Sequence, residues 1–190
     1  MEITGNKYLI HKKLFKLLGE EFSLFDNEGN MVAFADQRFK LREDIRIYTD
    51  KTKSTELLKM TTPKVIDFSP RFTIVDSATG ETLGFAKRAG MKSSLIQDEW
   101  SIFDAQDNEI GKASEDSTFL ALIRRFVVNL IPQSYNIVIN GQTVCTMHQN
   151  FNPFTLHVRV EFEENASVNF DKRLVMAVAI LICAIERRQN

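Results

Sequence analysis

An unbroken apolar run near the end of the chain places the strongest constraint on the fold. Leu174–Ile185 contains 12 successive hydrophobic side chains, bracketed by charged residues at 171–173 and 186–188. A helix of that length is about 18 Å long, whereas a bilayer core is about 30 Å thick and needs about 20 residues to span. The run therefore predicts a buried helix rather than a transmembrane one. Because it is apolar all round, other elements must cover it all round.

Four segments repeat a pattern that is typical of β-hairpins: an aromatic start, alternating residues, a turn and a second apolar stretch. They are Phe22–Asp26 with Gly29, Phe72–Asp76 with Gly80, Trp100–Asp104 with Asn108, and Tyr135–Ile139 with Asn140-Gly141. Asp, Asn and Gly supply tight reversals and tolerate positive φ, and an Asn-Gly pair suits a type I′ turn. The repeat therefore predicts a meander of antiparallel strands.

Alternating polarity also marks Phe39–Tyr48 and Phe154–Phe162 as extended segments with one buried face. With them the chain has about ten to twelve candidate strands, which fits an antiparallel sheet. A sheet closed into a barrel covers the apolar helix and removes exposed edges. We therefore expect a mainly β fold, a closed antiparallel barrel threaded by its own C-terminal helix. A second helix is predicted over 118–130, where apolar residues recur at helical spacing and Pro132 follows.

The composition narrows the functional classes. A length of 190 residues fits one domain covering 1–190, and a formal net charge of -1 argues against a general nucleic-acid binder. The 2 Cys residues are too few for a disulfide framework, and no apolar signal-peptide core follows Met1. These features predict a cytoplasmic protein that is not transmembrane.

No constellation in the sequence is typical of catalysis, of a cofactor or of a metal site. The 3 His residues are His11, His148 and His157, at spacings unlike those of metal ligands. Cys145 and His148 are three positions apart, which puts them on opposite faces of a strand. The sequence has neither a Gly-x-Ser-x-Gly elbow nor a phosphate-binding loop. We therefore expect no enzyme, no cofactor and no bound metal.

The segment Asp26–Asn30 superficially suggests a calcium-binding loop. In an EF-hand loop the twelfth position is a Glu, but counting from Asp26 that position is Gln37. The segment therefore predicts a plain hairpin turn.

Motifs spread over nearly the whole chain carry a resemblance to a known family. They are Lys13–Gly19, Phe22–Asn30, Arg38–Arg42, Asp98–Asp104, Gln149–Phe154 and Asp171–Leu181. With these motifs the chain resembles the LURP-one-related family, a branch of the Tubby C-terminal-like superfamily that also includes the phospholipid scramblases. The resemblance implies a single Tubby-like domain, a barrel of about twelve strands around a central helix. It implies no shared chemistry, because most members have no established biochemical activity.

Basic residues form the candidate surface for an anionic lipid. The candidates are Lys12, Lys13, Arg38, Lys40, Arg42, Lys87 and Arg88. On a strand, Arg38, Lys40 and Arg42 would share one face, where three cations can hold an anionic headgroup. The alternative interpretation is a solvated outer face of the barrel, and the sequence leaves both open.

Phe is the unusual residue of the composition, with 15 Phe against 3 Tyr and 1 Trp. Those in candidate strands are Phe22, Phe25, Phe34, Phe39, Phe68, Phe72, Phe85 and Phe103. We expect many of them to fill the space between the barrel wall and the helix. A barrel that is already plugged by a helix has little room for a ligand.

Two functional classes remain. The first is a non-catalytic module that binds anionic phospholipid headgroups at a membrane surface, by analogy with Tubby domains, and it requires the basic groups to converge in space. The second is a soluble protein–protein interaction or scaffold protein, which predicts scattered charges and an exposed apolar patch. Scramblase-like lipid transport is a third, weaker hypothesis, because the barrel would bury the one candidate membrane segment.

Overall fold

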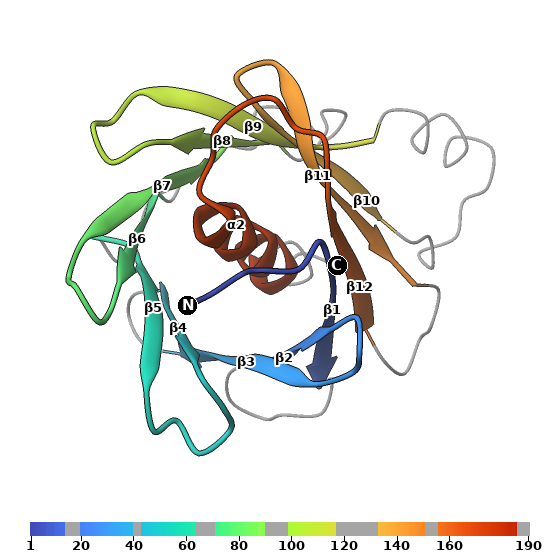
Figure 1. The fold of residues 1–190 in the computed structure, drawn as a ribbon. Coiled ribbons are helices and arrows are strands. Elements are labelled where there is room, and N and C mark those ends of the chain that lie inside the picture. Colours follow the sequence, from blue (N-terminus) through green and yellow to red (C-terminus); the bar gives the residue numbers. More distant parts are fainter. Residues whose placement is uncertain are drawn as a thin grey trace, which may run out of the picture.

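The computed structural model describes residues 1–13, 20–39, 43–63, 71–89, 99–116, 133–150 and 156–185. These residues form twelve β-strands and one α-helix (Figure 1). The strands are β1 (Lys7–Lys13), β2 (Glu20–Asp26), β3 (Met31–Phe39), β4 (Glu43–Tyr48), β5 (Glu56–Thr61), β6 (Arg71–Asp76), β7 (Thr82–Arg88), β8 (Glu99–Phe103), β9 (Glu109–Glu115), β10 (Ser134–Ile139), β11 (Gln142–Gln149) and β12 (Leu156–Phe162). The helix is α2 (Lys172–Ile185). The second helix predicted over 118–130 lies outside the described residues.

All twelve strands belong to one closed antiparallel barrel, as the sequence predicted. Each strand pairs with its neighbours along the chain, and β1 closes the ring by pairing with β12 from Lys7–Glu161 to Lys12–Leu156. Closure leaves none of these strands with an unpaired edge. α2 lies in the middle of the ring (Figure 1).

The four predicted hairpins are all present. They join β2 to β3, β6 to β7, β8 to β9 and β10 to β11. In the last of them Asn140 and Gly141 have φ angles of 48° and 81°, the positive values that a type I′ turn requires. A fifth turn, between β4 and β5, was not predicted.

The expectation of one extended segment over Phe39–Tyr48 was wrong. β3 ends at Phe39 and β4 begins at Glu43, and these two residues face each other in an antiparallel pair. The chain therefore reverses direction between them. Residues that face the interior have odd numbers on both sides of the reversal. Gln37 on β3 and its partner Ile45 on β4, for example, are both buried. Of the three cations that the sequence analysis placed on one strand face, Arg38 belongs to β3, and Lys40 and Arg42 lie outside the described residues.

The start of α2 is fixed by a cap and an ion pair. Asp171 Oδ1 accepts a hydrogen bond from the Arg173 amide at 2.8 Å, which caps the helix. Arg173 Nη1 lies 2.7 Å from Asp76 Oδ2 at the end of β6. Burial by itself raises the pKa of Asp171, but the hydrogen bonds and charge of Arg173 hold that pKa below its usual value. The helix is thereby tied to the barrel wall where it enters.

All residues of α2 from Leu174 to Ile185 are buried, which confirms the predicted core helix. Gly84 on β7 allows the helix to come close to the wall. A Cβ at this position would collide with the Phe103 carbonyl oxygen and lie 3.0 Å from a methyl carbon of Leu174. Because the helix lies close to the wall, the layer of side chains between them is thin. Most of the described wall side chains in this layer are aliphatic.

The expectation that many Phe residues fill this layer was wrong for most of those described. Of the eight, only Phe22 and Phe72 belong to the interior cluster in the described part of the chain. Phe85 and Phe103 lie on the outer face, where the Arg71 guanidinium is 4.1 Å and 5.1 Å from their ring centroids. A cross-strand cation gives these rings a partner outside the barrel. Phe39 (side chain) and Phe68 lie outside the described residues.

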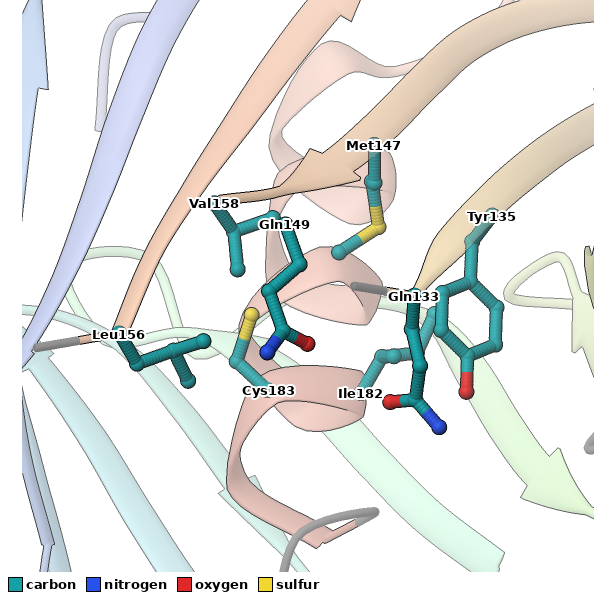
Figure 2. Close-up of a pocket in the computed structure, with 8 residues that line it drawn as sticks. All are labelled: Gln133, Tyr135, Met147, Gln149, Leu156, Val158, Ile182 and Cys183. Carbon is teal, nitrogen blue, oxygen red and sulfur yellow. The ribbon is translucent and has the colours of Figure 1, made fainter. Parts of the chain in front are cut away.

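The barrel has two distinct ends. We call the end with the five short turns the hairpin end; α2 enters the barrel there, beside Asp76 and Gly84. We call the other end the distal end; β1, β3, β5, β7, β9 and β11 finish there. α2 also finishes at the distal end, where Ile182 and Cys183 face β10, β11 and β12 (Figure 2).

Candidate functional site

The described side chains at the distal end enclose a small cavity between α2 and the wall, which Figure 2 shows. It is lined by Gln133, Tyr135, Met147, Gln149, Leu156, Val158, Ile182 and Cys183, and its volume is about 20 Å³. A space of that size holds about one water molecule. A larger ligand would therefore not fit here without displacing the helix or the wall.

Cys145 and His148 lie on opposite faces of β11, as predicted. Cys145 is fully buried, and burial raises the pKa of its thiol to about 12, which disfavours the thiolate form. His148 is exposed, and its Nδ1 is 3.1 Å from Ser134 Oγ on β10. Within the described ranges, no group of three His, Cys, Asp or Glu side chains is placed to hold a metal ion.

Asp26 is part of a plain turn, as its sequence context predicted. Its Oδ1 accepts hydrogen bonds from the amides of Glu28 and Asn30 at 2.9 Å and 2.8 Å, and its Oδ2 accepts one from Asn30 Nδ2 at 3.0 Å. These bonds, led by the one from the Asn30 side chain, hold the pKa of Asp26 below its usual value. Both carboxylate oxygens of Asp26 therefore accept hydrogen bonds from residues of the turn that Asp26 begins.

The topology brings five of the predicted basic residues to the same end of the barrel. Lys12 and Lys13 finish β1, Arg38 is the second-last residue of β3, and Lys87-Arg88 finishes β7. All three strands run toward the distal end. Lys40 and Arg42 lie outside the described residues.

The described side chains of these residues differ in exposure. Lys12 is only 5% exposed, and its Nζ lies 2.5 Å from Glu20 Oε1 and 5.6 Å from the Phe22 ring centroid. Arg88 is 7% exposed, whereas its neighbour Lys87 is exposed, because successive strand residues point to opposite faces. The side chains of Lys13 and Arg38 are outside the described part. Lys12 and Arg88 therefore do not present their charges to solvent as the sequence analysis expected.

Acidic residues share the distal half of the barrel, and several are engaged with neighbouring cations. Asp44 Oδ1 lies 3.0 Å from Arg46 Nε, and these contacts raise the pKa of Arg46 further above its usual value. Glu99 Oε1 lies 2.9 Å from Lys112 Nζ. Lys87 is paired with Ser101 on β8, the strand that carries Glu99. The Glu99–Lys112 pair therefore reduces the negative field that a bound anion would meet near Lys87.

A groove on the outer wall was not among the sequence-based candidates. It runs over β1, β2 and β12, has a volume of about 740 Å³, and its charged and histidine lining consists of Lys7, His11, Asp26, His157, Arg159 and Glu161. His11 and His157 come from the first and last strands, which meet only because the barrel closes. No local motif could have indicated this meeting.

In the described part of the chain, no helix is both long enough and apolar enough to cross a membrane.

The fold defines the class of protein: a closed, twelve-stranded antiparallel barrel built around a hydrophobic C-terminal helix. The family model described as LURP-one-related matches residues 33–183. This match extends from β3 into the last turn of α2, so it includes most of the barrel and the helix that fills it. The chain belongs to the LURP-one-related family. Comparison with curated proteins and with solved structures gives no match.

Proposed function

We propose that the chain is a non-catalytic module that binds anionic phospholipid headgroups, with the distal end of the barrel facing the membrane. The observation that carries the proposal is the common position of the basic strand ends of β1, β3 and β7. A cation near an anionic membrane surface contributes about 1 kcal/mol of attraction. Several such cations at one end would orient the barrel on the membrane.

Two further points support this proposal. The cavity beside α2 has a volume of only about 20 Å³, which favours ligand binding on the outside of the barrel. The resemblance to the Tubby-like superfamily also favours lipid recognition, by analogy with Tubby domains. On this proposal the protein is cytoplasmic and associates with membranes peripherally.

Lys87 is the most direct residue for testing the proposal, because it is exposed near the end of β7. The matched control is Ala105→Glu/Gln106→Glu, because both residues are exposed in the β8–β9 turn at the hairpin end. Lys87→Glu reverses a charge at the distal end, and the triple variant Arg38→Glu/Lys40→Glu/Arg42→Glu reverses the three charges that the sequence analysis grouped. The control changes the net charge by the same two units as Lys87→Glu, but at the other end of the barrel.

The experiment is co-sedimentation with vesicles of phosphatidylcholine alone and with vesicles that also contain phosphatidylserine, at low and high salt. We expect salt-sensitive binding to the anionic vesicles only, because screening weakens exposed charges. Lys87→Glu should weaken binding about fivefold or more, and the triple variant further, while Ala105→Glu/Gln106→Glu should have little effect. Equal binding to both vesicles, or equal losses in all variants with unchanged circular dichroism, would contradict the proposal.

A protein–protein interaction role is the second candidate, and one observation favours it. On the outer wall Arg71 lies against Phe85 and Phe103 and forms an ion pair with Asp107. Arg and aromatic side chains are enriched in the energetically dominant parts of protein interfaces. If neither vesicle binds the protein, this cluster becomes the first surface to test against protein partners.

Scramblase-like lipid transport is the least supported alternative. α2 is the most apolar segment of the chain, and its residues from Leu174 to Ile185 are buried inside the barrel. Inserting this helix into a bilayer would empty the barrel of its core.

A further inference from the structure

The groove over β1, β2 and β12 combines space with a histidine pair. His11 and His157 are directly opposite each other in the β1–β12 ladder. Their ring centroids are 4.4 Å apart, with the planes at 81°. Both residues are partly exposed, so ring nitrogens in this pair can meet a ligand in the groove of about 740 Å³.

The fixed charges around the histidine pair come from every neighbouring element. The cations are Lys7 on β1, Arg159 on β12 and Lys51 in the β4–β5 turn. The carboxylates in the groove lining are Asp26 on β2 and Glu161 on β12. These three cations and two carboxylates leave a formal charge of +1 among the described groups around the pair. A proton taken up by His11 adds to this positive charge.

One of the two carboxylates, Asp26, is further restrained. Asp26 directs its oxygens to the amides and side chain of its own turn, so it is held away from a ligand beside the histidines. The exposed Arg159 follows His157 by two positions, on the same face of β12. An anion placed between the pair and Arg159 would meet donors from both strands.

We infer that this groove is a binding site for a phosphate-type dianion, and that it binds the anion more tightly as the pH falls. The site lies on the side wall and not at the distal end, so the inference goes beyond the proposed membrane contact. A phosphorylated soluble molecule and a phosphomonoester lipid headgroup share this chemistry.

Proton linkage follows from the surroundings of His11. Burial, then the neighbouring His157, then the charge of Lys51 lower the pKa of the His11 ring below its usual value. An anion would offset the repulsion from both neighbours and favour the protonated ring. By linkage, a ligand that promotes proton uptake binds more tightly at low pH.

The chain offers a clean experiment, because it contains only 3 His residues. Their ring signals can be followed by NMR in pH titrations with sodium sulfate or with sodium chloride at matched ionic strength. Sulfate is a suitable probe because it stays dianionic over this range, so any pH dependence belongs to the protein. His148 serves as the internal control, because it lies outside the groove lining and contacts Ser134.

Sulfate should move the titration midpoint of His11 to higher pH and shift the ring signals of His157, while His148 follows the chloride titration. Sulfate binding should be about tenfold tighter at pH 5.5 than at pH 7.5. His157→Gln should flatten this dependence. Arg159→Gln should weaken binding at both pH values without flattening it, and neither variant should alter circular dichroism.

Equal shifts of all three histidines, or binding that is independent of pH, would overturn the inference. Repeating the titration with inorganic phosphate and with vesicles containing phosphatidic acid identifies the source of the anion. Because His11 and His157 report on the side wall, the inference can stand if Lys87→Glu leaves vesicle binding unchanged, and it can fail if the membrane proposal holds.

Discussion

Single aspartates at strand ends determine where the barrel wall turns back on itself. Asp26, Asp50, Asp76 and Asp104 each accept hydrogen bonds from amides of the turn that follows. In Asp26, Asp50 and Asp104 the pKa is lowered, chiefly by side-chain hydrogen bonds from Asn30, Thr52 and Asn108. These bonds are stronger when the accepting carboxylate is ionised.

Replacing Asp104 by Ala should therefore lower the melting temperature at neutral pH, because the amides of Gln106 and Asn108 lose their acceptor. A depressed carboxyl pKa contributes stability that is complete above the unfolded-state value of about 3.8 and is lost as the pH falls through the lower folded-state value. Thermal denaturation from pH 7 to pH 2 should show the difference between wild type and variant shrink in the acid range. Asp104→Asn keeps an acceptor oxygen and is the matched control. A pH-independent difference would contradict this account.

The sequence predicted these turns because Asp, Asn and Gly act locally, within a few residues of the reversal. It could not predict exposure equally well. Lys12 and Arg88 were expected at the surface, but both lie on the inner side of their strands, and Lys12 is paired with Glu20 from β2. Successive residues of a strand point to opposite faces of the sheet. In an adjacent basic pair such as Lys87-Arg88, one side chain therefore points outward and the other inward.

Among the elements, α2 supplies the centre of the hydrophobic core. Its identity was predictable because an all-apolar run bracketed by charges allows few other structures. The strand boundary between β3 and β4 was not predictable, because the apolar residues Phe39, Leu41, Ile45 and Ile47 are all at odd-numbered positions on both sides of it. The outer position of Phe85 and Phe103 also depends on Arg71, a residue of the neighbouring hairpin strand that periodicity alone does not pair with them.

Leu181→Ala in α2 should lower the free energy of unfolding by about 2–5 kcal/mol, because it opens a cavity at a fully buried position. Val178→Asp should prevent folding, since it places an unpaired charge in the same layer. Chemical denaturation measures the first variant, and soluble yield with circular dichroism measures the second. Ala105→Asp, in the exposed turn after β8, controls for adding a carboxylate. A soluble Val178→Asp protein with the wild-type melting curve would mean that α2 is not buried.

At the scale of the whole molecule, closure of the barrel brings together residues that are far apart in the sequence. It places the basic ends of three separate strands, β1, β3 and β7, at the distal end, and it brings His11 of the first strand against His157 of the last. The basic residues were identified from the sequence, but their convergence was not predictable, because it depends on the order and direction of the strands. The contact between the two histidines was not predictable from the sequence either, because it exists only where β1 pairs with β12.

The central claim is that α2 fills a closed barrel and leaves the outer surface to bind ligands. The 2 cysteines test this directly, because both are buried, Cys145 on the wall and Cys183 on the helix. The measurement is the rate at which a thiol reagent labels each one, with Cys145→Ser and Cys183→Ser isolating the two sites. We expect neither thiol to react in the native protein while both react rapidly in denaturant. Labelling of Cys183 in the native protein at the denatured rate would show that the helix lies outside the barrel.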